Sequence, residues 1–296
     1  MKVSRCAALL IGATAVVPAL RAQSLLDRAR SAQERGQLDS AYGLIQLAAD
    51  AEPARAEVQW LLGGIACQKA GSAGPLNSLD LVRKCKAALS RAVELAPDSL
   101  TYLESLAGFL SQAPGLAGGD KDSALKLAAR VRQRDDARGD LLSANLLWSG
   151  DAAAKARADS LAEGAGARHP ADRLVQLRVA AWWAGTGRPE RALAVYEGLA
   201  ARDPQDPVAR FFVGRQLVLL RRDLRRAQGE LRFAAAAPAP PAGTPSFTPG
   251  APWYRLGQTY VQLGMSDSAR ICFEQALRIN PQLQPARLAL DSLSRP

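Results

Sequence analysis

Side chains suited to acid–base or metal chemistry are scarce in this sequence. Its 296 residues include one histidine, His169, and four cysteines. A general base needs a nucleophile and an orienting partner. Nothing near His169 suggests either, and its place before Pro170 is typical of a surface turn. A single histidine also excludes the two-His and three-His sets that hold catalytic zinc. We therefore expect no catalytic residue, no metal site and no enzymatic activity.

Two glycine pairs, Gly164-Ala165-Gly166 and Gly185-Thr186-Gly187, have the spacing seen in dinucleotide-binding loops. Such a loop follows a strand and opens a helix. Both pairs stand instead at the ends of predicted helices, where glycine terminates a helix. The sequence therefore indicates no cofactor.

Arginine is concentrated between residues 215 and 232, where only Asp223 and Glu230 offset the positive charge. The arginines are Arg215, Arg221, Arg222, Arg225, Arg226 and Arg232. One interpretation is the solvated face of a helix, and the other is weak contact with an anionic envelope surface or an acidic partner. Few aromatic residues interleave, so we expect no nucleic-acid partner.

The N-terminus has the pattern of a secretory signal. Lys2 and Arg5 precede the apolar residues 6–17, Pro18 interrupts them, and the small Ala22 offers a cleavage site. Twelve apolar residues are too few to cross a bilayer, which needs roughly 20. We expect an exported protein, periplasmic if the source has two membranes and otherwise secreted. An uncleaved anchor is the alternative. Removal of residues 1–22 would lower the net charge from +10 to +7.

Residues 250–283 contain apolar and small residues at helical spacings of three and four. Small residues let two helices approach closely, Gly264 ends the first helix, and Pro281 stops the second. The residues that form this pattern are Trp253, Leu256, Gly257, Tyr260, Gly264, Ala269, Phe273, Ala276, Leu277 and Pro281.

This pattern resembles the tetratricopeptide repeat (TPR) over the whole 34-residue length of that unit. Weaker copies precede it. Their small residues at repeat position 8 are Ala29, Gly64, Ala107, Ala144, Ala180 and Gly214, and proline recurs at position 32. Two short segments resemble motifs found in exported bacterial TPR proteins: Lys84-Cys85-Lys86 and Gln112-Ala113-Pro114-Gly115. The resemblance implies an all-α, right-handed solenoid of about seven helix-turn-helix units with a capping helix.

The repeat register divides the chain into four parts. Residues 1–22 form the signal, 23–237 units one to six with the third and fourth degenerate, 238–249 a Pro/Ala-rich linker, and 250–296 the last unit with its capping helix. The segment 238–252 is either a spacer or a docking motif.

The repeat register also places Cys67 and Cys85 opposite each other on the two helices of unit two. In an oxidising compartment they could form a disulfide closing a loop of about 18 residues. The alternative is a pair of small buried thiols. Cys272 is left unpaired and is expected to be buried.

In TPR arrays the first helices of successive units line a concave groove. The resemblance implies that groove positions fall on Trp148, Leu177, Phe211, Arg215, Tyr254, Gln258 and Gln262, preceded by Gln33, Gln68, Glu104 and Gln112. Trp182, Trp183 and Trp253 are expected to pack between helices instead. Aromatic anchors among glutamines and arginines suit an extended peptide or a partner helix. We therefore expect a non-catalytic protein- or peptide-binding scaffold in the cell envelope. The alternative is binding of a small ligand such as a cell-wall fragment, or an accessory role beside an envelope enzyme.

Overall fold

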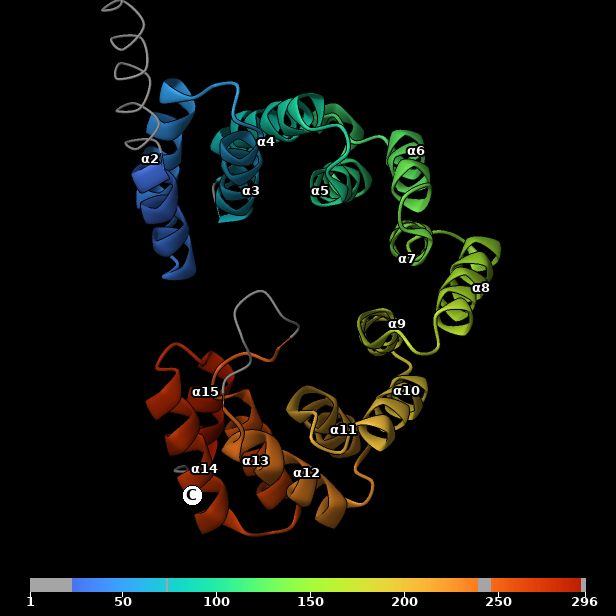
Figure 1. Cartoon of the computed structure of the whole chain (residues 1–296). Coiled ribbons are helices and arrows are strands. Elements are labelled where there is room, and N and C mark those ends of the chain that lie inside the picture. Colours follow the sequence, from blue (N-terminus) through green and yellow to red (C-terminus); the bar gives the residue numbers. More distant parts are fainter. Residues whose placement is uncertain (1–22, 73, 239–245, 294–296) are drawn as a thin grey trace, which may run out of the picture. The chain divides into compact units, whose positions relative to one another are not determined.

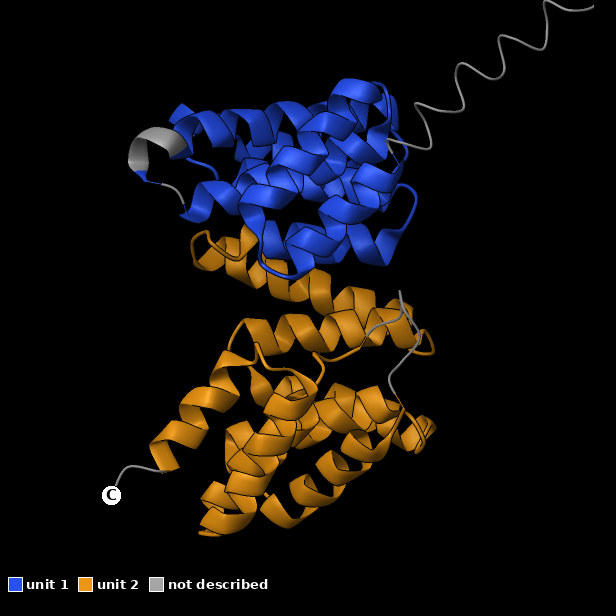
Figure 2. Cartoon of the chain, turned by 90° about the vertical axis from the view of Figure 1, so that its left-hand side faces the viewer, with its two compact units in different colours: residues 1–146 blue, residues 147–296 orange. Residues whose placement is uncertain are grey.

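The computed structural model describes residues 23–72, 74–238 and 246–293. All regular secondary structure in these ranges is helical, which confirms the predicted all-α class. The predicted signal, residues 1–22, and residues 239–245 of the predicted linker lie outside the described residues. The chain divides into two compact units, residues 1–146 and 147–296 (Figure 2).

In the first unit, residues 23–34 form the opening helix, and successive helices pack side by side as hairpins (Figure 1). The helices that follow are α2 (Leu38–Ala51), α3 (Ala56–Ser72), α4 (Pro75–Leu95), α5 (Leu100–Gln112), α6 (Lys121–Arg132) and α7 (Asp136–Leu147), with a short 3-10 helix η1 (Gly115–Ala117) between α5 and α6.

The second unit continues the same pattern of helices joined by short turns. It contains α8 (Ala152–Arg168), α9 (Arg173–Gly185), α10 (Pro189–Arg202), α11 (Pro207–Leu220), α12 (Leu224–Ala236), α13 (Ala251–Gln262), α14 (Ser266–Ile279) and α15 (Gln284–Leu293). The predicted capping helix is confirmed as α15, which buries Ala286 and leaves Leu288 exposed.

Polar N-caps fix where the first helix of several hairpins begins. The Asp172 carboxylate accepts hydrogen bonds from the backbone N–H groups of Leu174 and Val175 at the start of α9. Asp206 and Ser99 play the same part for α11 and α5. Each of these caps follows two residues after a proline that stops the preceding helix. One short segment therefore ends one helix and starts the next.

Glycine allows the two helices of some hairpins to approach closely. A Cβ on Gly257 would lie 2.4 Å from the ring of Phe273, and one on Gly214 would lie 2.7 Å from Leu231 Cγ. The same close approach occurs between α3 and α4 at Gly63, where a Cβ would lie 2.7 Å from Leu89 Cγ. The predicted position, Gly64, has no such neighbour within 4 Å. The register of α3 is therefore shifted by one residue from the prediction.

The loop between α5 and α6 is held by contacts with α4. Gly118 takes the left-handed conformation, with φ of 88°, and Lys86 Nζ donates to its carbonyl oxygen at 2.9 Å. A positive φ of this kind favours glycine. The loop is thus tied to the helix that carries Cys85.

One other expectation differs from the structure. Trp182 and Trp183 are buried between helices as expected, but Trp253 is only half-buried.

The boundary between the two compact units falls between residues 146 and 147, at the end of α7. Helix α12 packs against α13, and the last hairpin belongs to the second unit.

Candidate functional site

A pocket of about 620 Å³ opens in the first unit among the opening helix, α3, α4 and α5. Its floor is largely apolar and includes Trp60, Leu61 and Phe109. Trp60 is held in place because its Nε1–H donates to Ser105 Oγ at 2.9 Å and its ring lies 5.7 Å from that of Tyr102. Gly64 also lines the pocket. The one-residue shift of α3 therefore turns a glycine toward the pocket, where it leaves open space.

Amide side chains stand at the edge of this pocket. Gln33 Nε2 donates to Gln68 Oε1 at 2.9 Å, and Gln68 and Gln112 are exposed. Each amide has two donor hydrogens and an acceptor oxygen, so the Gln33–Gln68 pair retains capacity for a ligand. The structure thus gathers Gln33, Gln68, Glu104 and Gln112, all predicted groove positions, around one cavity.

Other charged groups near this pocket are paired within the first unit. Glu104 forms an ion pair with Arg138, whose Nη2 donates to Glu104 Oε2 at 2.6 Å. This hydrogen bond and the carboxylate charge raise the pKa of Arg138 despite its partial burial. Arg30 pairs with Glu57. The pocket edge is therefore polar but carries little unbalanced charge.

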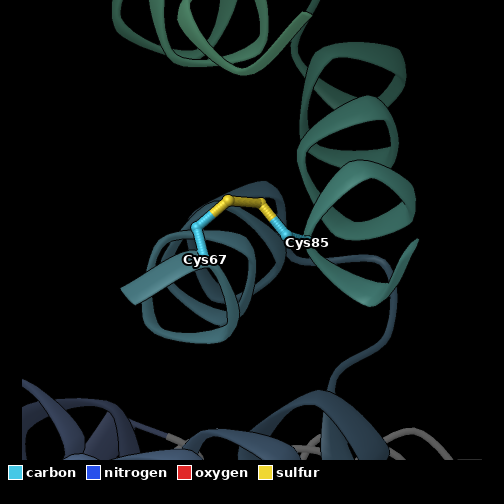
Figure 3. The surroundings of a disulfide bond; sticks show 2 residues. All are labelled: Cys67 and Cys85. Atoms are coloured by element: carbon cyan, nitrogen blue, oxygen red, sulfur yellow. A yellow bond between two sulfur atoms is a disulfide. The ribbon is translucent and has the colours of Figure 1, made fainter. Parts of the chain in front are cut away.

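Cys67 and Cys85 are joined as a disulfide between α3 and α4, with a Cα–Cα distance of 5.3 Å (Figure 3). Cys85 is fully buried, whereas Cys67 is half-buried and lines the pocket. The bridge fixes α3, which carries Trp60 and Gln68, against α4. Cys272 is a free, buried thiol, and burial raises its pKa to about 11.

Trp148 lies in an aromatic cluster of the second unit. Its ring is 5.6 Å from that of Trp182, and the Arg188 guanidinium lies 4.4 Å from its centroid. Arg188 also stacks over Trp182 and Trp183 and pairs with Asp159. An arginine side chain that lies over several indole rings contributes packing contacts as well as cation–π attraction. The contacts of Trp148 are thus taken up inside the unit.

A second pocket, of about 370 Å³, lies in the second unit between α11, α13 and the start of α15. We call it the aromatic–arginine pocket. It is lined by Phe211, Phe212, Arg215, Ser246, Phe247, Thr248, Ala251, Tyr254, Arg255, Leu283 and Pro285. Three predicted groove residues, Phe211, Arg215 and Tyr254, meet here.

Phe211 is not an open anchor. It is only 4% exposed, and its ring lies 4.6 Å from that of Phe247, which precedes α13. Leu177, on α9, is also buried. The prediction that these two side chains face an open groove does not match their burial, because neighbouring side chains cover them.

The two predicted glutamines of α13 act within the unit. Gln258 Nε2 donates to the Tyr254 hydroxyl at 2.8 Å, and its Oε1 accepts from Arg255 Nη1 at 2.7 Å. Gln262 Nε2 donates to the Val218 carbonyl at the end of α11. Gln258 therefore positions two pocket residues, while Gln262 links two helices.

Sequence reasoning missed Arg255, Phe212 and Phe247. Arg255 follows Tyr254 at a position not assigned to the groove. Phe247 stands in the Pro/Ala-rich segment, where a lone aromatic residue among prolines and small residues was its only signal.

The predicted arginine-rich stretch does not act as one surface. Arg226 pairs with Glu197 and Glu230, and Arg232 Nη2 donates to the Tyr260 hydroxyl at 2.6 Å. Arg215 lines the aromatic–arginine pocket instead. The charge of this stretch is thus divided among ion pairs, a helix contact, a pocket and the exposed side chains of Arg221, Arg222 and Arg225.

Among the described residues, no three His, Cys, Asp or Glu side chains gather where they could hold a metal ion. None of the helices described is both long and apolar enough to span a bilayer.

Comparison with known proteins identifies the repeat. The family model described as "Tetratricopeptide repeat" matches residues 251–283, which form the α13–α14 hairpin. No curated protein matches the sequence significantly.

Solved structures with a similar fold are TPR and related helical-repeat proteins. A tetratricopeptide repeat protein from Parabacteroides merdae is 13% identical, with a TM-score of 0.52, over 93% of this chain and 100% of that one. Yeast Tom70 is 12% identical, with a TM-score of 0.56, over 86% of this chain and 51% of that one. The human IFIT1 dimer with PPP-AAAA is 15% identical, with a TM-score of 0.52, over 86% of this chain and 58% of that one. The chain therefore has the TPR fold.

Proposed function

We propose that this protein is a non-catalytic scaffold that binds a protein or peptide partner through the first helices of its hairpins. The TPR fold supports this class of function, although a fold by itself does not assign a partner. The pocket of the first unit carries the proposal further. It combines an apolar floor with amide side chains on the opening helix, α3 and α5, of which those of Gln68 and Gln112 are exposed. Apolar side chains of a peptide would fill the floor, while the amides would bond its backbone.

We further propose that the protein acts in the cell envelope after export. The N-terminal sequence pattern supports export. The Cys67–Cys85 bridge is consistent with it, because disulfides persist in oxidising compartments. The disulfide also joins α3 and α4, two walls of the pocket. Export to an oxidising compartment would therefore allow the bond that preorganises the binding site.

The experiment is a crosslinking pull-down from the native envelope fraction with wild type and a Gly64→Met variant. A Cβ at Gly64 meets open space on the pocket side, so methionine would fill the pocket without entering the helix crossing. Gly43→Met is the matched control, because Gly43 is exposed on α2 and also has open space around it. Proteins captured by wild type and Gly43→Met but lost with Gly64→Met would support the proposal. Equal capture by all three would contradict the pocket as the site.

Binding of a small ligand, such as a cell-wall fragment, is a second candidate, because a pocket of about 620 Å³ lies within the range of small-molecule sites. Thermal shift with purified wall fragments tests it. A rise in Tm that Gly64→Met abolishes and Gly43→Met retains would favour this function over a protein partner.

A further inference from the structure

The aromatic–arginine pocket contains two arginines whose positive charges are not balanced. Arg215 Nε is buried and has no hydrogen-bond acceptor. Arg255 donates to the neutral Gln258 amide. Burial, together with the nearby charge of Arg215, lowers the pKa of Arg255 below its usual value. Two cations that repel each other in a partly buried place are unfavourable for the unliganded protein.

No acidic residue relieves this repulsion. Neither arginine forms an ion pair in the described part of the chain, and the pocket lining contains no Asp or Glu. The sequence outside the described residues also holds no Asp or Glu side chain. Neighbouring arginines behave differently: Arg173 pairs with Asp206 and Arg210 with Glu230. The aromatic–arginine pocket thus holds two neighbouring, partly buried arginines without an acidic partner among the described residues.

An aromatic ring lies beside each of the two guanidinium groups. Arg215 Cζ lies 5.9 Å from the Phe212 ring centroid, and Arg255 Cζ lies 5.2 Å from that of Tyr254. Phe247, which packs on the buried Phe211, adds apolar surface, while Ser246, Thr248 and Pro285 at the edge are exposed to solvent. A guanidinium flanked by rings keeps its donor edge free for a planar anion.

We propose that this pocket binds an acidic peptide segment, with a Glu or Asp carboxylate between Arg215 and Arg255 and a neighbouring apolar side chain against the phenylalanines. The volume of about 370 Å³ accommodates such a pair of side chains, and the exposed edge lets a peptide backbone pass on either side. The carboxylate supplies the charge that the lining lacks. This inference rests on the proposed peptide-binding function and specifies the chemistry of one subsite.

The test uses a displayed library of random nonapeptides with blocked C-termini, panned on the full chain. Wild type is compared with the double variant Arg215→Gln, Arg255→Gln. The control is Arg222→Gln, Arg225→Gln, which removes equal charge from exposed positions at the end of α11 and on α12. Enriched sequences are synthesised as peptide amides with Glu or Asp retained or changed to Gln or Asn, and their Kd values are measured.

We expect wild type to enrich peptides with an acidic residue next to an aromatic or aliphatic one. Neutralising that residue, or using the pocket double variant, should weaken binding about 30-fold or more, whereas the control variant should change Kd less than about threefold. The pocket double variant should also unfold at an equal or higher Tm than wild type, because it removes unpaired buried charge. A lower Tm for the pocket double variant would show that its loss of binding comes from misfolding, and that result would overturn the inference.

Two further outcomes separate this inference from the proposed function. Enriched peptides without an acidic residue, or undiminished binding to the pocket double variant, would overturn the inference and leave the peptide-binding function standing. If wild type enriches no peptide at all, both fail.

Discussion

Arg173 donates two hydrogen bonds to the carboxylate of Asp206, from Nε to Oδ2 at 2.6 Å and from Nη2 to Oδ1 at 2.9 Å. Arg173 is the first residue of α9, and Asp206 is the N-cap of α11. Asp206 Oδ1 also accepts from the backbone N–H groups of Val208 and Ala209. One buried carboxylate therefore starts a helix and joins it to the first helix of the preceding hairpin.

Asp206→Asn should lower the free energy of unfolding by about 2 kcal/mol at pH 7, because it removes a charged cap and the partner of Arg173. Urea unfolding followed by circular dichroism measures the change. The control is Asp291→Asn, because Asp291 is exposed on α15. It should change the free energy of unfolding by less than about 0.5 kcal/mol. Equal effects of the two substitutions would contradict a structural role for this pair.

The contribution of Asp206 should also depend on pH. Burial raises the pKa of this carboxyl, but the hydrogen bonds from Arg173 and from the backbone outweigh burial and bring it below the usual 3.8. A lowered folded-state pKa stabilises the protein above the unfolded pKa, and that stability is lost as pH falls through the folded value. The difference between wild type and Asp206→Asn should therefore be constant from pH 7 to 5 and shrink below about pH 4. A difference that grows in acid would show that the sign is wrong.

Reduction of the Cys67–Cys85 bridge should lower the stability of the first unit by about 3 kcal/mol. The double variant Cys67→Ala, Cys85→Ala should reproduce the loss without reductant and become insensitive to it. Unfolding curves with and without reductant check this, and mass spectrometry of peptides from the unreduced protein should find the two cysteines linked. Two free thiols in the protein isolated from the envelope would contradict the structure.

Cys272 should resist alkylation in the folded protein. Burial raises its pKa to about 11, so almost no thiolate is present at pH 8. Iodoacetamide labelling read peptide by peptide should leave Cys272 unmodified until urea unfolds the second unit. Rapid labelling under native conditions would contradict the burial of this side chain.

Gly63 and Gly64 offer a matched pair for the register of α3. Gly63→Ala should destabilise the first unit by about 1–3 kcal/mol, because the new Cβ would overlap Leu89. Gly64→Ala should instead stabilise it by up to about 1 kcal/mol, because alanine is a better helix former and the site is open. The opposite order would restore the register predicted from sequence.

These two glycines also show where sequence analysis reached its limit. The α13–α14 hairpin was predicted residue by residue because Gly257, Tyr260, Phe273 and Pro281 fill a full repeat pattern. In α3 two adjacent glycines fit position 8 equally well, and only the contact with Leu89 decides between them. A periodic pattern fixes a helix more firmly than its exact rotation.

The candidate sites were predictable only in part. Gln33, Gln68 and Gln112 line one pocket, because equivalent positions on consecutive first helices share a face. The burial of Phe211 was not predictable, since it depends on Phe247, which reaches it from a segment without periodicity. Trp148 was expected to face a groove. In the structure the Arg188 guanidinium lies over its ring, and this contact depends on tertiary structure.

The most direct test of the binding role is site-specific photo-crosslinking in native envelopes. A benzophenone side chain is placed at Gln112, at the pocket edge of α5, or at Arg83, an exposed residue of α4. We predict that the Gln112 probe forms a discrete crosslinked adduct with a partner protein and that Arg83 does not. Loss of this adduct with Gly64→Met, but not with Gly43→Met, would assign it to the pocket. No adduct at Gln112, or the same adduct from both probes, would contradict the account.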